Sequence, residues 1–220
     1  MSTIGLISEG ITDQIVIEHI LDGLLDDEDL SVEPLQPTRD ETDENLAITA
    51  GNWVKVFEYC ESTQFQQAVE NMDFVIIQID ADIFKKENLN KKYKVVLQNL
   101  SSEEQLEVIK NKLIELIGHE LVENHGNKII FAISIDSIEC WLLPIYYSNK
   151  PQIASKEVNC LETLNKELIK VENFIIDQKN PRYYRKICKP YRKKKELTKL
   201  YKLNPNFTAF IEDVQLKMVL

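Results

Sequence analysis

The chain has 220 residues, of which 44% are hydrophobic and 28% are charged. This composition is typical of a soluble globular protein with one large domain, or with a core domain and an appendage. Its longest apolar runs fall short of the roughly 20 residues that span a bilayer, and no signal peptide is recognisable, so we expect a cytoplasmic protein without a membrane segment. The net charge of −10 argues against non-specific attraction to nucleic acid.

Short apolar runs alternate with segments of helical periodicity along the first two thirds of the chain. The run at residues 74–79 is continuous, as in a central strand that is buried on both faces. Ser101 and Glu104 form a capping box at a helix start. In chain order we predict a strand at 4–8, a helix that Thr12 or Asp13 caps, a strand at 32–35 and a polar loop at 38–51. A helix at 52–69, a strand at 74–79 and a polar segment at 80–93 are expected next. The last predicted elements of this region are a helix at 101–117, a strand at 128–134 and a helix at 138–147.

This alternation predicts an α/β fold with a mostly parallel sheet flanked by helices. The sheet domain is expected to cover residues 1–147. Residues 148–220 lack further strand patterns and are expected to form a helical, basic extension that is packed on this domain.

The cysteines are scattered along the chain. They are Cys60, Cys140, Cys160 and Cys188, and no two of them form a Cys-x-x-Cys pair. Such spacing favours buried free thiols in a reducing cytosol over disulfides or a zinc site.

Acidic residues follow three of the predicted strands. Glu9 comes after the first strand, Asp80 and Asp82 after the third, and Asp136 and Glu139 after the fourth. The carboxyl ends of parallel strands meet at one sheet edge, where open α/β folds bind their ligands. In an extended segment Asp80 and Asp82 would project the same way, about 6.6 Å apart. Carboxylates that lie close together without cations raise one another's pKa. A divalent metal such as Mg²⁺ or Mn²⁺ would offset the repulsion between them.

Three segments carry a resemblance to a known family. Residues 9–13 (Glu-Gly-Ile-Thr-Asp) and 80–82 (Asp-Ala-Asp) resemble the TOPRIM domain, which topoisomerases, primases and the OLD-type nucleases of bacterial phage defence share. Residues 137–143 resemble the Glu-x-Trp-Leu segment of small OLD-like TOPRIM proteins, and residues 51–53 (Gly-Asn-Trp) fit the same group. The resemblance covers roughly residues 1–143 and implies a TOPRIM-like, Rossmann-like sheet.

The resemblance implies a nuclease that depends on Mg²⁺ or Mn²⁺ and cleaves DNA or RNA in phage defence. Glu9, Asp80 and Asp82 would be catalytic and bind the metal, and Glu139 would be a further ligand. A lysine late in the domain, Lys189 or one of residues 193–195, would assist. Because the chain has no Walker A motif, an ATPase would act in trans. A homo-oligomer is a further expectation.

A basic segment offsets the acidic body. Residues 179–202 hold eleven basic residues and one acidic residue, so this segment carries about +10 and the remainder about −20. Its cations can neutralise phosphates while Tyr183, Tyr184 or Tyr191 stack on bases. The alternative is a solvated helical face with the tyrosines packed inward. The residues predicted to contact nucleic acid are Arg182, Arg185, Lys186, Lys189, Arg192 and Lys193.

Two rival functions fit the same residues. The first is a non-catalytic TOPRIM-like module that binds a partner protein or nucleic acid. The second is a nucleotide-sugar transferase, in which Asp-x-Asp after an apolar strand also binds Mn²⁺, although this leaves Glu9 and Gly10 without a role. Asp13 is interpreted as a helix-start residue stabilised by the helix dipole rather than as a ligand.

Overall fold

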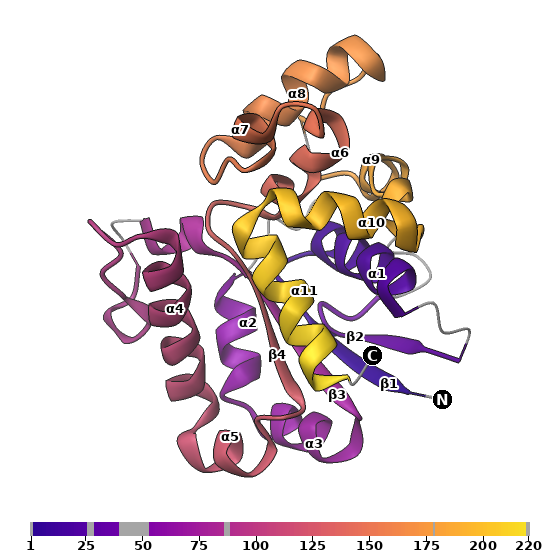
Figure 1. Ribbon diagram of the computed structural model, residues 1–220. Coiled ribbons are helices and arrows are strands. Elements are labelled where there is room, and N and C mark those ends of the chain that lie inside the picture. The colour runs from indigo at the N-terminus through magenta and orange to yellow at the C-terminus, as the bar shows by residue number, and fades with distance from the viewer. Residues whose placement is uncertain (1, 26–28, 40–52, 86–88, 178, 219–220) are drawn as a thin grey trace.

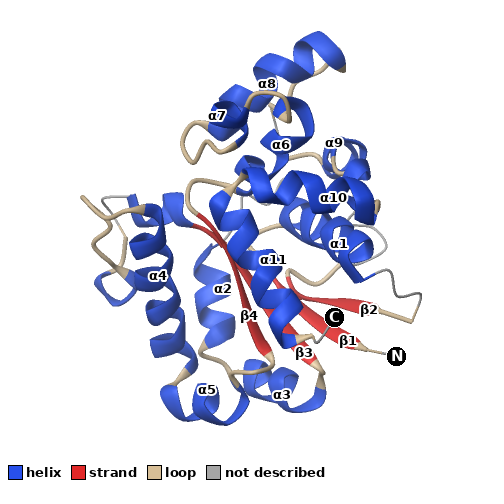
Figure 2. Cartoon of the chain, viewed as in Figure 1, coloured by secondary structure: helices blue, strands red, loops and turns tan. Residues whose placement is uncertain are grey.

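A computed structural model describes residues 2–25, 29–39, 53–85, 89–177 and 179–218. Its centre is a four-stranded, all-parallel sheet in the order β2-β1-β3-β4 (Figure 2). The strands are β1 (Thr3–Ile7), β2 (Ser31–Gln36), β3 (Phe74–Asp80) and β4 (Ile129–Ser134). The predicted α/β class and the four predicted strands are confirmed, and β3 is central as expected.

Helices cover both faces of this sheet (Figure 1). One face carries α1 (Ile11–Leu25) and α11 (Pro205–Lys217). The other face carries α2 (Trp53–Cys60), α3 (Thr63–Asn71) and α4 (Ser102–Ile117), and α5 (His119–His125) leads into β4. Alternation along β3 explains the two layers, because Val75 and Ile77 join the core under α2 and α4 while Ile76 joins the core under α1 and α11.

Two predicted helices are each interrupted. The predicted helix at 52–69 ends at Cys60, and a new helix starts at Thr63 because the Ser62 hydroxyl accepts a hydrogen bond from the Phe65 amide. The predicted helix at 138–147 is a 3₁₀ turn, η3 (Ile138–Leu142), followed by α6 (Leu143–Tyr147) with a proline in its first turn. The capping box of α4 is confirmed. Most of the predicted loop at 38–51 lies outside the described residues.

The chain after residue 148 is helical, and most of it gathers over the carboxyl end of the sheet and against α1 (Figure 1). Its elements are α7 (Pro151–Ala154), α8 (Cys160–Val171), α9 (Pro181–Ile187), η4 (Lys189–Arg192), α10 (Lys194–Leu200), η5 (Tyr201–Leu203) and α11. α11 returns to β4, and the ring of Trp141 in η3 stacks on Phe207 and on Phe210 of α11 at centroid distances of 5.1 and 5.2 Å. Within the described residues, no helix is long and apolar enough to cross a membrane.

The expectation of four free thiols is wrong for one pair. Cys140 in η3 and Cys160 at the start of α8 form a disulfide, with their Cα atoms 4.9 Å apart. Their separation of 20 residues gives no sequence signal, because only the packing of α8 on η3 brings them together. Cys60 and Cys188 are free and buried, as predicted.

Gly23 marks the closest approach of α1 to the C-terminal helices. A Cβ atom at this position would lie 1.8 Å from the backbone oxygen of Tyr191 in η4. We therefore expect Gly23→Ala to lower the free energy of unfolding by about 1–3 kcal/mol, the usual cost of overpacking, although alanine is the better helix former. Urea unfolding measures this change, and equal or greater stability of the variant would contradict the packing of η4 on α1.

Candidate active site at the carboxyl end of the sheet

Three buried carboxylates from separate strand ends meet at one edge of the sheet. Glu9 follows β1, Asp80 is the last residue of β3, and Glu139 lies in η3 after β4. Their exposed fractions are 9%, 4% and 1%. The parallel topology brings them to this edge, as the sequence predicted.

Asp80 is held by its neighbours in the sheet. Its Oδ1 accepts hydrogen bonds from Gln78 Nε2 at 2.9 Å and from Ser134 Oγ at 2.5 Å. Its backbone amide donates to Glu9 Oε1 at 3.1 Å, so the end of β3 also orients the Glu9 side chain. Oδ2 of Asp80 does not share these bonds and faces Lys179, whose Nζ lies 3.9 Å away.

Asp13 belongs to the same cluster. It lies in the first turn of α1, which begins at Ile11, so neither Asp13 nor Thr12 is the residue that precedes the helix. Its side chain is fully buried, Oδ1 lies 3.5 Å from Lys179 Nζ, and Oδ2 has no hydrogen-bond partner. The first-turn position agrees with the helix-start interpretation, but the burial and the contact with Lys179 also make Asp13 part of the acidic cluster.

Lys179 is the cation that contacts Asp13 and Asp80 in the described part of the chain. Its side chain is 40% exposed, and it enters the cluster from the segment before α9. The sequence places Lys179 in the basic segment, whereas the resemblance to TOPRIM proteins implies Lys189 or one of residues 193–195 as the assisting lysine. Lys189 and residues 193–195 are exposed on and after η4. No local motif distinguishes Lys179 from its neighbours.

Burial and mutual repulsion raise the pKa of three of the four acids. Burial, reinforced by the charge of Asp13, raises the pKa of Glu9 to about 7. Burial also raises the pKa of Asp80 well above its ordinary value and raises the pKa of Asp13, although Lys179 opposes both shifts. Burial acts on Glu139 in the same sense, but the charge of Lys179 and hydrogen bonds from side chains leave its pKa below the usual value. The pKa of Lys179 is well above its usual value because the attraction of these carboxylates exceeds the effect of burial.

Two of the tyrosines in the basic segment pack inward. The Tyr184 hydroxyl donates a hydrogen bond to Glu139 Oε1, and the Tyr191 hydroxyl donates to the backbone oxygen of Trp141. Both rings are fully buried, so the predicted stacking of Tyr184 or Tyr191 on bases is wrong, and the alternative of inward packing is confirmed for them. Tyr183 stacks on Phe174 at a centroid distance of 4.6 Å.

Asp82 and Asp136 follow β3 and β4 at the same edge of the sheet as the cluster. The chain leaves the extended conformation after Asp80 and forms η1 (Ala81–Lys85), so the expected strand alternation of Asp80 and Asp82 is wrong. The Asp82 amide donates to the Asp136 backbone oxygen at 3.3 Å. The carboxylate of Asp136 is engaged by Lys85 Nζ at 3.4 Å and by the Cys160 amide at 3.3 Å.

The acids do not form a preassembled metal cage. In the described ranges, no three of the predicted ligands, or of these with Asp13, bring their oxygens within 4.8 Å of one another. The group of ligand atoms that meets this distance there is Asp136, Cys140 and Cys160. The ammonium group of Lys179 lies between the carboxylates of Asp13 and Asp80.

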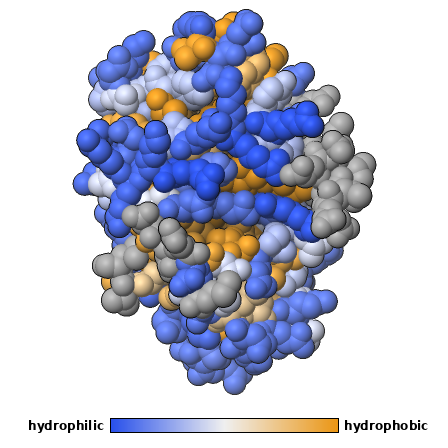
Figure 3. Space-filling view, turned by 90° about the vertical axis from the view of Figure 1, so that its right-hand side faces the viewer, coloured by the Kyte–Doolittle hydropathy of each residue, from blue (hydrophilic) through white to orange (hydrophobic). Residues whose placement is uncertain are grey.

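The basic residues predicted to contact nucleic acid lie on α9, η4 and the following turn. Arg185 is half-buried, and Arg182, Lys186, Lys189, Arg192 and Lys193 are exposed. Two of the exposed ones form ion pairs, Lys186 with Glu172 at 2.6 Å and Arg192 with Asp22 at 2.9 Å. Arg185, Lys189 and Arg192 line a surface hollow of about 520 Å³ against α1. Figure 3 shows the molecule from this side, as a largely hydrophilic face with hydrophobic patches between hydrophilic bands.

Fold and site together define an α/β protein with an acid-rich cluster at the carboxyl end of a parallel sheet. Comparisons of the chain with protein-family models, with curated proteins and with solved structures gave no match. The resemblance to TOPRIM proteins therefore remains one of short segments.

Proposed function

We propose that this chain is a divalent-metal-dependent nuclease with a TOPRIM-like arrangement, which cleaves phosphodiester bonds in DNA or RNA. The observation that carries the proposal is the cluster of Glu9, Asp13, Asp80 and Glu139 around Lys179. Four buried acids outnumber one ammonium group, and burial together with their mutual repulsion raises the pKa of Glu9, Asp13 and Asp80. Such a cluster costs folding free energy, which favours a role in function.

The donor set fits Mg²⁺ or Mn²⁺, which prefer carboxylate oxygens. Oδ2 of Asp13 is buried without a partner, so it is available as an acceptor for a cation. We assign the metal to Glu9, Asp80, Asp82 and Glu139, and add Asp13 to this set. The ion would supply activation of a water molecule and stabilisation of the charge that develops on the phosphate.

The remaining roles fall to the chain's own side chains. With a pKa near 7, Glu9 is suited to accept a proton from a water molecule at neutral pH. The ammonium group of Lys179 would neutralise charge on a phosphate oxygen once it leaves Asp13 and Asp80. Tyr184 holds Glu139 in place through its hydroxyl.

The wider setting rests on the resemblance and on the charge pattern. The exposed cations of α9 and η4 would guide the nucleic-acid backbone toward the acidic edge. We further propose an effector of phage defence in the cytoplasm, with an ATPase partner in trans and a homo-oligomeric state.

The proposal is tested by incubating the full chain with single-stranded DNA, duplex DNA and RNA, each with Mg²⁺, with Mn²⁺ and with EDTA. We expect cleavage of at least one substrate with a divalent ion and none with EDTA. Absence of cleavage of every substrate with either ion, or cleavage that persists in EDTA, would contradict it.

A second candidate function is a non-catalytic TOPRIM-like module that binds nucleic acid or a partner protein. It is favoured by the contacts of Lys179, which partly neutralise Asp13 and Asp80. It is also favoured by the distances between the carboxylates, because in the described ranges no three of them bring their oxygens within 4.8 Å of one another. Gel-shift measurements separate the two functions. A binding module retains nucleic-acid affinity without a divalent ion and without cleavage, and its affinity does not depend on Asp80.

A further inference from the structure

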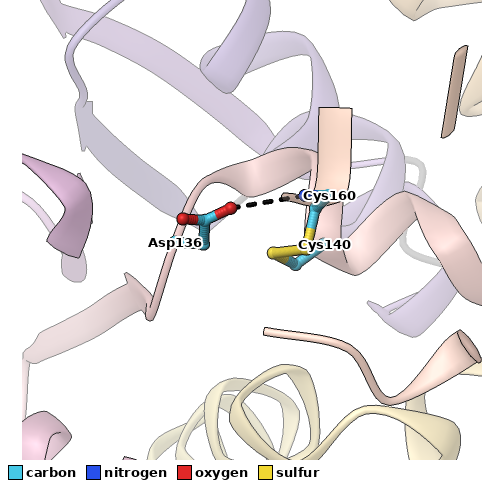
Figure 4. A group of neighbouring side chains, drawn as sticks. All are labelled: Asp136, Cys140 and Cys160. Atoms are coloured by element: carbon cyan, nitrogen blue, oxygen red, sulfur yellow. Dashed lines mark hydrogen bonds between the residues drawn. A yellow bond between two sulfur atoms is a disulfide. The ribbon is translucent and has the colours of Figure 1, made fainter. Parts of the chain in front are cut away.

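A second group of side chains of the types that ligate metals lies next to the acidic cluster but is separate from it. Asp136 comes from the loop after β4, Cys140 from η3 and Cys160 from the first position of α8 (Figure 4). One ligand atom from each residue lies within 4.8 Å of the other two. Both sulfur atoms belong to buried residues, whereas the Asp136 side chain is 21% exposed.

The chemistry of these donors is unlike that of the acidic cluster. Two thiolates and one carboxylate form a donor set that Zn²⁺ accepts, whereas Mg²⁺ and Mn²⁺ prefer oxygen. Three protein ligands leave a fourth tetrahedral position for a water molecule, which the partial exposure of Asp136 permits.

The local structure supports this set of ligands. The Cys160 amide donates to Asp136 Oδ2, which fixes the carboxylate beside the sulfur atoms. Cys160 also begins the 12-residue helix α8, and the positive end of the helix dipole favours a thiolate there. The other contact of Asp136 is with Lys85, a 48% exposed side chain that can swing away to leave Oδ1 free.

We infer that Asp136, Cys140 and Cys160 form a redox-dependent zinc site. With the cysteines reduced, the two thiolates and Asp136 bind one Zn²⁺. The disulfide seen in the structure is the oxidised, metal-free state, in which each sulfur is bonded to the other and no thiolate remains.

Exchange between the two states requires a two-electron oxidant, for which we name a peroxide. The sulfur–sulfur bond forms as the two zinc–sulfur bonds break, and the two thiolates lose two electrons. Hydrogen peroxide takes these electrons together with two protons and gives two water molecules, and the Zn²⁺ ion is released. A dithiol reverses the step by reducing the disulfide.

The test uses the full chain, reduced with a phosphine and freed of metal by a chelator that is then removed. Zinc titration against a chromogenic chelator should show one tight site per chain. Co²⁺ in place of Zn²⁺ should give a thiolate-to-cobalt charge-transfer absorption. Peroxide should release the metal and leave two titratable thiols per denatured chain, from Cys60 and Cys188.

Variants assign the ligands. Cys160→Ser should abolish the tight site, and Asp136→Asn should weaken zinc binding by about tenfold or more. Cys60→Ser is the matched control, because this buried thiol lies in α2 in the other core, and it should bind zinc normally. Should Cys160→Ser fail to fold, the zinc affinity of Asp136→Asn and the release of zinc from the unaltered chain by peroxide still test the inference. The inference is overturned if the reduced chain binds no zinc tightly, if Cys160→Ser or Asp136→Asn binds as tightly as the unaltered chain, or if peroxide leaves the metal bound.

Discussion

Asp80→Asn and Glu9→Gln are each expected to lower the rate of divalent-ion-dependent cleavage by about 100-fold or more, while the protein stays folded. The fold should survive because an amide oxygen at position 80 can still accept the hydrogen bonds from Gln78 and Ser134. Likewise, an amide oxygen at position 9 can accept from the backbone amide of residue 80. What each substitution removes is a carboxylate that would bind the divalent ion. Initial rates on the best substrate measure the loss, and circular dichroism checks the fold.

Glu70→Gln provides a matched control for both variants. Glu70 is an exposed residue in α3, on the opposite face of the sheet from α1. This variant should cleave at the unaltered rate. If Asp80→Asn and Glu9→Gln also cleave at that rate, the assignment of the acidic cluster as the catalytic site is wrong.

Lys179→Met is expected to destabilise the metal-free protein by about 1–3 kcal/mol at pH 8, because buried carboxylates lose the cation between them. We place the cost below that of a fully buried pair, since Lys179 is 40% exposed and water screens it. The variant should also lose most of its cleavage activity, because Lys179 neutralises phosphate charge in the proposed function. Urea unfolding in the presence of EDTA measures the stability.

The loss should be smaller at pH 5 than at pH 8. The pKa of Glu9 is raised to about 7 in the folded state, whereas the unfolded chain releases this proton near the ordinary value of 4.5. Between these values the folded state binds more protons, so the stability contributed by Glu9 falls as the pH rises. At pH 5 Glu9 is protonated and uncharged in the folded state, so removal of the Lys179 cation lowers the free energy of unfolding by less.

Lys199→Met is the control for this comparison. Lys199 forms an exposed ion pair with Glu196 in α10, and such pairs contribute less than about 1 kcal/mol. A Lys179→Met protein that is as stable as Lys199→Met at pH 8 would show that Lys179 does not compensate the acids.

The parallel sheet and the edge at which the acids meet could be predicted from the sequence because both depend on local patterns. A continuous apolar run identified β3, and the acids after β1, β3 and β4 followed from the rule that parallel strands end at one edge. The turn after Asp80 escaped prediction because the change from strand to 3₁₀ turn within one residue leaves no periodic signal.

The contributions of the C-terminal helices could not be predicted, because they depend on contacts between residues far apart in the chain. Lys179 reaches Asp13 across a separation of 166 residues, and Tyr184 reaches Glu139 across 45. Neither residue lies in a motif. Asp13 was visible in the sequence next to Glu9, but its position in the first turn of a helix gave it a sufficient structural explanation.

In the proposed function Glu9 and Asp80 bind a divalent ion at the carboxyl end of the sheet, and anomalous diffraction from crystals grown with Mn²⁺ would locate that ion. We predict an anomalous peak bonded to the carboxylates of Glu9 and Asp80, with the Lys179 ammonium group displaced from its contact with Asp80. A map in which Lys179 still lies between Asp13 and Asp80, with no manganese bonded to either Glu9 or Asp80, would contradict the claim.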